Sequence, residues 1–267
     1  MGNAMQNDPQ KFLEVALAAV KKAEPVFTKH FGKPATISEK TSDRDWVTNA
    51  DKEIEEMLVS EIRAAFPSHE IVGEEFSATL KPTGEFSWYI DPIDGTSQYI
   101  HCIPLCCISV ALIDSKGPLV AVISSPETEE VFHAVRGGGA YKNGQPITVS
   151  KKAELTSSYG GIGWSNSELL EGFVARIMPF IGKVRVFATS ALQMCFVADG
   201  RFDTYVVTGI KPWDIAAGVL IAQEAGASVT GFDNRPYRIS DTEALATNGL
   251  LHAPFLEVIK RVRKTNV

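Results

Sequence analysis

The stretch from Trp88 to Thr96, Trp-Tyr-Ile-Asp-Pro-Ile-Asp-Gly-Thr, constrains the fold of this chain more than any other. The part before Asp91 is aromatic and β-branched, which predicts a buried strand over 86–90. Pro92 has no N–H group and disfavours helix at the preceding residue, so we expect the strand ladder to stop there. The pattern predicts a strand that enters a tight turn bearing two carboxylates.

Asp91 and Asp94 lie three residues apart on this turn, and Gly95 can adopt backbone angles that other residues avoid. Two crowded carboxylates repel each other unless a cation lies between them. Oxygen ligands without a nearby His or Cys suit magnesium, calcium or manganese better than zinc. The N–H groups of Gly95 and Thr96 are suited to binding phosphate. The same residues also fit a plain chain reversal, so this stretch alone leaves both interpretations open.

Two further acidic segments favour the metal-binding interpretation. Gly73-Glu74-Glu75 follows a short strand pattern at 70–72, and Trp213-Asp214 opens an apolar helix that we expect over 215–225. The three segments, in this order and spacing, form the signature of the inositol monophosphatase family, which this chain resembles over about 12–259. The matching residues are Gly73-Glu74-Glu75, Asp91-Pro92-Ile93-Asp94-Gly95-Thr96, Trp213-Asp214-Ile215-Ala216-Ala217-Gly218 and Glu224-Ala225-Gly226-Ala227.

Length and composition limit the class of protein. A chain of 267 residues forms one large domain or two smaller ones that share a core. Its hydrophobic fraction of 45% and charged fraction of 22% are ordinary for a globular protein. The net charge of -6 argues against a nucleic-acid partner. No apolar run approaches the roughly 20 residues that cross a bilayer, and no secretory signal is visible, so we expect a cytoplasmic protein without a membrane partner.

The four cysteines are interpreted as reduced core residues, because Cys106 and Cys107 are adjacent and Cys102 and Cys195 lie in apolar surroundings. A nucleophilic Cys–His pair at His101 and Cys102 lacks a third partner, which disfavours it.

Hydrophobic periodicity predicts alternating helices and strands. The helices are expected over 9–30, 49–66, 168–180, 190–198, 215–225 and 255–263, and 35–46 is expected to be a loop. The strands are expected over 70–72, 86–90, 106–113, 119–124, 131–135, 159–163, 184–187, 204–207 and 228–230. The triple glycine at 137–139 is not expected to be a phosphate loop, because no Lys-Ser/Thr pair follows it. These elements predict layers of helix and sheet, an α/β or α+β fold.

The family resemblance makes this fold a layered α-β-α-β-α sandwich of the inositol monophosphatase and fructose-1,6-bisphosphatase type. It implies an N-terminal α+β subdomain over 1–148 that carries most metal ligands. It also implies a C-terminal α/β subdomain over 149–267 that carries Asp214 and the substrate contacts. A homodimer is a further expectation from the same resemblance.

The resemblance implies a magnesium-dependent, lithium-sensitive phosphatase that hydrolyses a small phosphate monoester with metal-activated water. Two or three Mg²⁺ ions are expected. One would be bound by Glu74, Asp91 and the carbonyl of Ile93, and a second by Asp91, Asp94 and Asp214. A third would lie near Glu74, held mostly by water. The chemistry agrees, since such ions neutralise phosphate charge and activate water.

The resemblance also assigns catalysis to Asp51, Glu74 and Thr96. Asp51 and Thr96 should orient the attacking water, while the amides of Gly95 and Thr96 hold phosphate oxygens. Asp51 has a second interpretation, because a carboxylate in the first turn of a helix is favoured by the helix dipole. For Glu75 a structural charge and a supporting role near the metal remain equally open.

The substrate contacts implied by the resemblance come from both halves of the chain: Ile93, Asp94, Gly95, Thr96, Ala188, Thr189, Ser190, Val207 and Asp214. Val207 occupies the position where inositol-cleaving members have Glu, and valine cannot accept a hydrogen bond from a ring hydroxyl. The resemblance also implies alternative substrates, because the same scaffold serves histidinol phosphate, sugar bisphosphates and phosphoadenosine phosphate. Arg185, Lys211 and Asp203 are candidate contacts or surface charges. A catalytically idle binding homologue is the alternative from another functional class.

Overall fold

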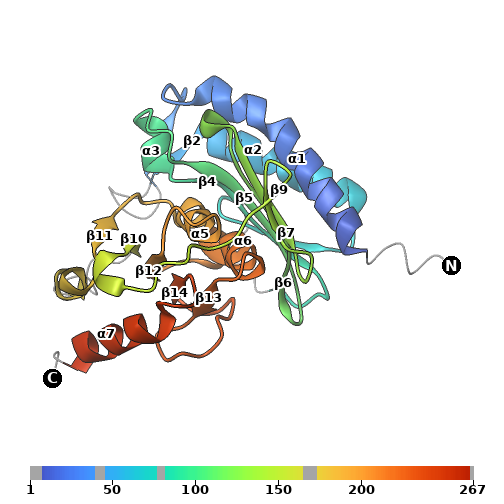
Figure 1. Cartoon of the computed structure of the whole chain (residues 1–267). Helices are drawn as coiled ribbons and strands as arrows, with labels where there is room; N and C mark the ends of the chain where they lie inside the picture. Colours follow the sequence, from blue (N-terminus) through green and yellow to red (C-terminus); the bar gives the residue numbers. More distant parts are fainter. Residues whose placement is uncertain (1–7, 40–45, 77–81, 165–172, 265–267) are drawn as a thin grey trace.

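The computed structural model describes residues 8–39, 46–76, 82–164 and 173–264. Two sheets lie in layers with helices between them and on both outer sides (Figure 1). The order of layers is α1 and α2, a seven-stranded sheet, α5 and α6, a five-stranded sheet, and finally α4 and α7. This is the layered arrangement that the sequence predicted.

The seven-stranded sheet has the order β3-β4-β5-β6-β7-β8-β9, and only its β3–β4 pair is parallel. Alternate residues of β5 face different cores: Ile108 and Val110 pack with α1 and α2, and Cys107 and Ala111 pack with α5 and α6. Both faces of the sheet are covered, which explains why β5 is apolar along most of its length. The strands are β3 Glu70–Gly73, β4 Ser87–Asp94, β5 Cys107–Asp114, β6 Gly117–Ser125, β7 Glu130–Val135, β8 Ala140–Lys142 and β9 Gln145–Pro146.

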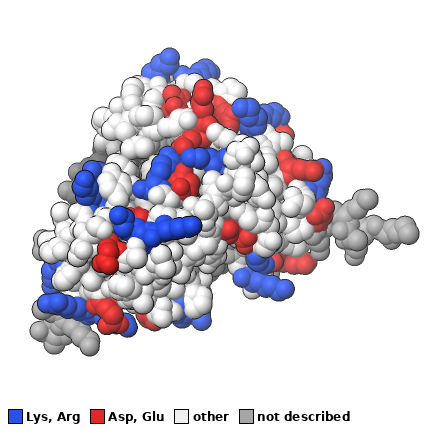
Figure 2. Space-filling model, viewed as in Figure 1, with Lys and Arg blue, Asp and Glu red and all other residues white. Residues whose placement is uncertain are grey.

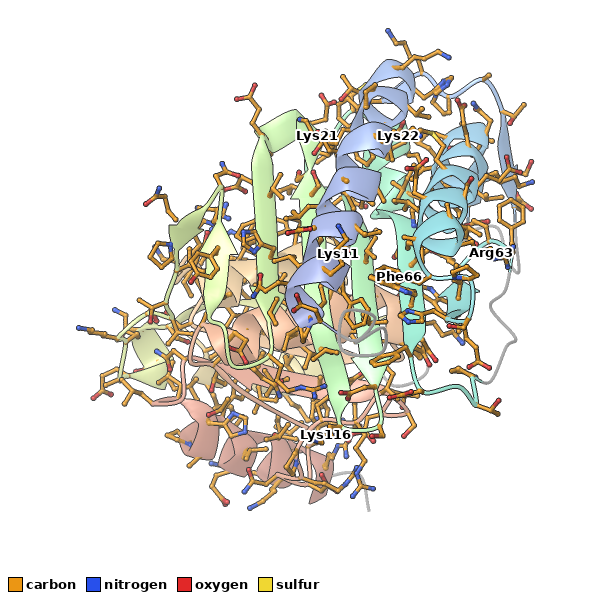
Figure 3. All side chains as sticks on the ribbon, turned by 90° about the vertical axis from the view of Figure 1, so that its right-hand side faces the viewer. Lys11, Lys21, Lys22, Arg63, Phe66 and Lys116 are labelled. Carbon is orange, nitrogen blue, oxygen red and sulfur yellow. The ribbon has the colours of Figure 1, made fainter. Side chains whose placement is uncertain are left out.

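Helices α1 (Pro9–His30) and α2 (Asn49–Ala65) lie side by side over the outer face of this sheet (Figure 3). Asp8 caps α1, where its side chain accepts a hydrogen bond from Gln10 N at 3.0 Å. An ion pair between Lys22 and Glu61 joins the two helices at their surface. Their apolar stripes form one core with β4, β5 and β6.

Helices α5 (Ser190–Ala198) and α6 (Pro212–Glu224) fill the space between the sheets. Both helices are apolar around most of their circumference, as a helix buried on every side requires. Glu224, at the end of α6, accepts hydrogen bonds from the backbone N–H groups of Gly137 at 2.8 Å and Gly139 at 2.9 Å. These amides of the triple glycine are therefore occupied by a carboxylate of the same chain.

The five-stranded sheet has the order β11-β10-β12-β14-β13, with α7 and α4 over its outer face. Its strands are β10 Tyr159–Trp164, β11 Lys183–Arg185, β12 Thr204–Thr208, β13 Ser228–Thr230 and β14 Glu243–Thr247, and the helices are α4 Phe173–Ile177 and α7 His252–Lys264. The shorter elements are β1 Ile37–Glu39, β2 Trp46–Thr48, α3 Thr96–Ile100, η1 Pro126–Thr128, η2 Leu155–Ser157 and η4 Met178–Phe180. Of the helices described, none has the length and apolarity to span a membrane.

Several local predictions were wrong. The expected loop over 35–46 contains β1 and the first residue of β2, strands that pair antiparallel, and 40–45 lie outside the described residues. Strand β4 does not stop before Pro92: pairing shifts register after Asp91 and resumes at Asp94, so the proline lies within a bulge. Cys102 is exposed, whereas the other three cysteines are buried as expected. Strand β14 was not predicted, and 168–172 of the expected helix over 168–180 lie outside the described residues.

Candidate active site

A pocket of about 180 Å³ lies where the end of β4 meets the beginnings of α5 and α6. Its lining contains all five predicted metal ligands: Glu74, Asp91, Ile93, Asp94 and Asp214. It also contains most of the predicted substrate contacts, which include Gly95, Thr96, Ala188, Ser190 and Val207. The structure thus brings together residues from four separate segments of the chain. Asp51 and Thr189 do not line the pocket, and each lies directly behind a residue that does.

The turn after β4 sets the direction of its two carboxylates. Asp91 Oδ1 accepts a hydrogen bond from Ile93 N at 3.1 Å, which closes a local turn around Pro92. Gly95 has a φ of +93° and caps α3, and a Cβ atom there would lie 3.0 Å from the carbonyl oxygen of Leu105. Only glycine fits this combination of backbone angle and close approach.

The beginning of α5 anchors Asp94. Its carboxylate accepts hydrogen bonds from Thr189 Oγ1 at 2.6 Å, Ala191 N at 2.7 Å and Ser190 N at 3.2 Å. Burial raises the pKa of Asp94 to about 6, and these hydrogen bonds partly oppose the rise. Thr189, predicted as a substrate contact, therefore has an observed role in holding Asp94.

Asp91 is almost fully buried and Asp214 is partly buried, and their carboxyl groups line the same pocket. Burial raises the pKa of both groups well above the usual range, and the charge of Glu74 adds to the rise. Asp214 lies in the first turn of α6, where it accepts a hydrogen bond from Lys211 N at 2.8 Å. Neither lysine nor arginine is among the described residues that line this pocket.

The donor set fits a hard divalent cation, because it consists of carboxylate and carbonyl oxygens. In the observed conformation of the described residues, no three His, Cys, Asp or Glu side chains form a preformed metal-binding site. The acidic side chains share one pocket instead, so binding an ion requires small movements that draw them together. The bound cation would then offset the repulsion among these carboxylates, which adds to the effect of burial in raising their pKa values.

Asp51 combines two functions in one carboxylate. One oxygen accepts hydrogen bonds from Thr48 N at 2.8 Å and Thr48 Oγ1 at 2.7 Å, and so begins α2. The other oxygen lies 3.4 Å from Thr96 Oγ1, which also donates to the carbonyl of Ile93 at 3.1 Å. Asp51 thus lies in the first turn of α2 as expected, and its remaining oxygen faces the pocket through Thr96.

The wall opposite the carboxylates is mostly apolar and contains Val207 and Ile210. Tyr205, which the sequence analysis missed, places its hydroxyl 3.1 Å from Ser190 Oγ in the same wall. A signal for Tyr205 was present, because it lies two residues before Val207 and hence on the same face of β12.

Two of the charged candidate contacts are used elsewhere. Asp203 accepts hydrogen bonds from Ser150 Oγ at 2.5 Å and Tyr159 N at 2.7 Å, which is a structural role. The guanidinium of Arg185 lies 4.9 Å from the centre of the Tyr159 ring. On the face drawn in Figure 2, positive and negative side chains are interspersed.

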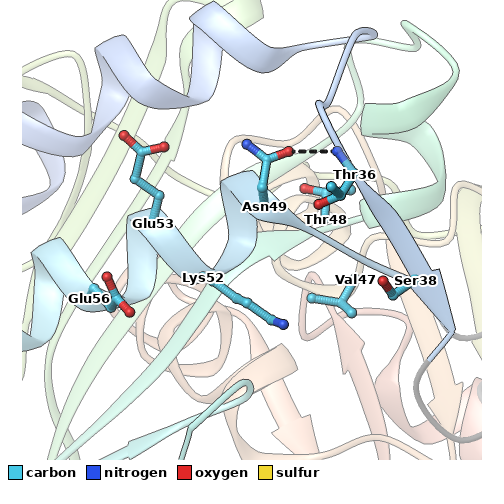
Figure 4. A pocket seen from close by; sticks show the side chains of 8 residues that line it. All are labelled: Thr36, Ser38, Val47, Thr48, Asn49, Lys52, Glu53 and Glu56. Carbon is cyan, nitrogen blue, oxygen red and sulfur yellow. Dashed lines mark hydrogen bonds between the residues drawn. The ribbon is translucent and has the colours of Figure 1, made fainter.

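A second hollow of about 240 Å³ lies between the β1–β2 hairpin and α2 (Figure 4). In it Asn49 Oδ1 accepts a hydrogen bond from Thr36 N at 3.1 Å. The side chains of Lys52, Glu53 and Glu56 form its α2 side. None of the predicted site residues lines this hollow, so we assign the chemistry to the pocket at the end of β4.

The chain is similar over nearly its whole length to known proteins of one family. The model of the inositol monophosphatase family matches residues 8–264. Inositol monophosphatase 1 of Solanum lycopersicum is 35% identical over 264 residues, which cover 94% of this chain and 95% of that protein. The fructose-1,6-bisphosphatase/inositol-1-monophosphatase of Thermotoga maritima is 33% identical over 250 residues, with 94% and 96% covered.

A solved structure of a Thermotoga maritima IMPase superposes with a TM-score of 0.87 at 32% identity and covers 96% of this chain and 99% of that one. The predicted fold class is thereby confirmed. This chain belongs to the inositol monophosphatase family, a family of generally metal-dependent enzymes, and is a phosphomonoesterase.

Proposed function

We propose that this chain is a magnesium-dependent phosphatase that hydrolyses a small phosphate monoester, of the inositol 1-phosphate kind, by direct attack of water. The observation that carries the proposal is the group of four acidic side chains in one pocket: Glu74, Asp91, Asp94 and Asp214. Next to them lie Gly95 and Thr96, whose amides begin a helix and suit a phosphate group. A dianionic phosphate would not enter such an acidic pocket without cations.

Two or three Mg²⁺ ions fit this donor set. Glu74, Asp91 and the Ile93 carbonyl would hold one ion, and Asp91, Asp94 and Asp214 would hold a second, with a third near Glu74. When bound, such ions neutralise the charge of the phosphate and lower the pKa of water. The hydrogen bonds from α5 to Asp94 fix one ligand in advance, which reduces the reorganisation needed on binding.

Thr96 and Asp51 are proposed to orient the attacking water. The Thr96 hydroxyl donates its proton to the Ile93 carbonyl, so its oxygen remains able to accept a hydrogen bond from water. Asp51 lies behind this hydroxyl, and its nearer carboxylate oxygen, 3.4 Å away, is the alternative acceptor for the same proton. Catalysis then consists of positioning and electrostatic stabilisation, without a covalent intermediate on the protein.

The pocket wall that contains Val207 and Ile210 is relevant to which substrate the enzyme prefers. Neither of these two side chains offers an acceptor to a ring hydroxyl, so we propose that inositol 1-phosphate is not the best substrate. The relative from Thermotoga maritima is named for both fructose-1,6-bisphosphate and inositol 1-phosphate. A sugar bisphosphate is therefore one alternative substrate. Histidinol phosphate and phosphoadenosine phosphate are the other two.

Phosphate release from an aryl phosphate, with magnesium and with a chelator, tests the reaction class. Turnover that disappears with the chelator and returns with magnesium supports the proposal. Absence of turnover on every phosphate ester tried would indicate a binding homologue instead. A panel of phosphorylated metabolites ranked by kcat/KM then identifies the substrate. A homodimer and lithium sensitivity remain predictions, to be tested by light scattering and by a lithium titration.

A further inference from the structure

Glu55 is a buried carboxylate that the proposed mechanism does not use. It lies one helical turn after Asp51 in α2, has no exposed surface and does not line the active-site pocket. Its neighbours Glu53 and Glu56 are exposed on the outer side of the same helix (Figure 4). An acidic side chain is very rarely buried without a specific reason.

Both carboxylate oxygens of Glu55 are bonded to the turn that follows β3. Oε2 accepts a hydrogen bond from Glu75 N at 2.8 Å, and Oε1 accepts one from Phe76 N at 3.0 Å. These two amides follow Glu74 directly in the chain. The carboxylate is therefore fixed to the backbone on one side of Glu74.

Gly73, on the other side of Glu74, is shaped to the same carboxylate. A Cβ atom at this position would lie 2.0 Å from Glu55 Oε1 and 2.4 Å from Glu55 Cδ. Any side chain on residue 73 would push Glu55 away from the two amides. The glycine of the Gly-Glu-Glu motif thus has a packing reason that does not involve the metal directly.

The electrostatic setting agrees with a clamp that is specific to a carboxylate. Burial raises the pKa of Glu55 to about 7, and the two backbone hydrogen bonds oppose the rise. The charges of Glu75 and Glu74 add to it. A leucine at this position would also be buried and would avoid the cost of desolvating a carboxylate. The function of the acid therefore lies in its two acceptor oxygens.

We propose that Glu55 is a positioning residue, which clamps the turn from Gly73 to Phe76 and thereby sets the direction in which Glu74 enters the pocket. The inference rests on the proposed role of Glu74 as a metal ligand. Outer partners that orient a metal ligand commonly change metal affinity by 10- to 100-fold when they are removed. Glu55 acts through Glu74 and touches neither metal nor substrate.

The test is Glu55→Gln, with Glu56→Gln as the matched control. The amide keeps the shape of the side chain, but its NH₂ group cannot accept the second backbone N–H. We expect the magnesium concentration for half-maximal activity to rise about tenfold, with kcat at saturating magnesium within about twofold of wild type. The control, one residue along the helix and exposed, should match wild type in both.

A second readout does not depend on activity. Binding of Mn²⁺ to the metal-free protein, measured by calorimetry, should weaken about tenfold in Glu55→Gln and not in Glu56→Gln. Melting in chelator shows whether the variant is folded. If Glu55→Gln is unfolded, Gly73→Ala is measured instead, because it displaces the same carboxylate from the opposite side and should weaken Mn²⁺ binding in the same way.

The double variant Glu55→Gln/Gly73→Ala gives the sharpest outcome. Two changes that break one clamp should weaken metal binding by much less than the product of their separate effects. Unchanged Mn²⁺ binding in a folded Glu55→Gln protein, or an equal loss of kcat at every magnesium concentration, would overturn the inference. If the wild-type protein itself hydrolyses phosphate esters without metal, the proposed function is wrong. That result differs from a failure of the Glu55 inference alone, in which wild type needs metal and Glu55→Gln binds it normally.

Discussion

Thr189 Oγ1 donates a 2.6 Å hydrogen bond to Asp94 Oδ2, although the two residues are separated by 95 positions in the chain. Ala191 N donates to the same oxygen at 2.7 Å. The carboxylate at the end of β4 is thus held by the beginning of α5. The predicted metal ligands acquire their geometry only when α5 packs against the seven-stranded sheet, so the site depends on the tertiary fold.

Thr189→Val should weaken metal binding without unfolding the protein. Valine has nearly the same shape but removes the hydroxyl donor, so Asp94 retains its backbone hydrogen bonds and the weak one from the Cys107 thiol at 3.8 Å. We expect a stability loss of about 1 kcal/mol and a several-fold higher magnesium requirement. The exposed Thr242→Val serves as the control in urea unfolding and magnesium titrations. A magnesium requirement equal to wild type would show that the hydroxyl does not support the site.

Asp214→Asn should lower kcat by about a hundredfold or more, since it removes one charge from the proposed metal site. Its effect on stability should have the opposite sign in metal-free protein. Burial and like charges raise the pKa of Asp214, so a neutral side chain removes an unfavourable electrostatic free energy from the folded protein. We expect the melting temperature in chelator to equal or exceed that of wild type, and magnesium to raise it less. Near-native kcat at ordinary magnesium would rule out Asp214 as a ligand.

The motif residues of the site were predictable from the sequence, because short-range chemistry specifies them. The two carboxylates around Pro92, the glycine at 95 and the acid in the first turn of α6 each carry a local signal. The residues that surround these motif residues carry no such local signal. Glu55 belongs to a charged run in α2, and only its burial and its hydrogen bonds to the turn after β3 show that its side chain points inward.

The fold was predictable where periodicity is strong and failed where tertiary contacts decide. Strand β14, Glu-Ala-Leu-Ala-Thr, contains little that favours a strand, yet it lies between β12 and β13 and pairs with both. Its position in the sheet overrides its weak propensity. Pro92 ends a strand in most contexts, but here the register shift allows pairing to resume at Asp94.

Thr96→Ala should lower kcat by about 100-fold with a smaller effect on KM. Its hydroxyl can donate its proton to the Ile93 carbonyl or to Asp51 and is assigned to orienting water, whereas backbone amides hold the phosphate. Thr96→Ser retains the hydroxyl and should keep most of the activity. Steady-state kinetics at saturating magnesium decides between roles, since a raised KM with unchanged kcat would assign Thr96 to substrate binding.

His69 should make stability fall in mild acid. Its Nδ1 accepts a hydrogen bond from the buried Trp88 Nε1 at 3.0 Å, and burial lowers its pKa below the usual 6.5. The unfolded chain therefore binds the proton at a higher pH than the folded chain does. Stability contributed by neutral His69 is present above about pH 6.5 and is lost as the pH falls below it.

The measurement compares urea unfolding of wild type and His69→Gln at pH 7.5 and 5.5, both in chelator. Glutamine can still accept from Trp88 but does not titrate in this range. The stability difference between the two pH values should be smaller for the variant. Equal differences in the two proteins would mean that His69 does not contribute to the pH dependence.

The last prediction concerns substrate choice at Val207. This side chain is 1% exposed and forms the pocket wall with Ile210, beside the Tyr205 hydroxyl. Val207→Glu should improve kcat/KM for inositol 1-phosphate about tenfold, because a carboxylate accepts hydrogen bonds from ring hydroxyls. Val207→Leu, which adds bulk without an acceptor, should give no improvement.

The same substitution has a price in stability, because the new carboxylate is buried and unpaired until substrate binds. The melting temperature should therefore fall in the absence of ligand and recover in part with inositol 1-phosphate bound. Kinetics and melting must be measured on the same preparation, so that a partly unfolded sample is not taken for a poor enzyme. If wild type already prefers inositol 1-phosphate over the sugar, histidinol and nucleotide phosphates, Val207 does not decide specificity. Ser190 and Tyr205 are then the groups that hold the ring.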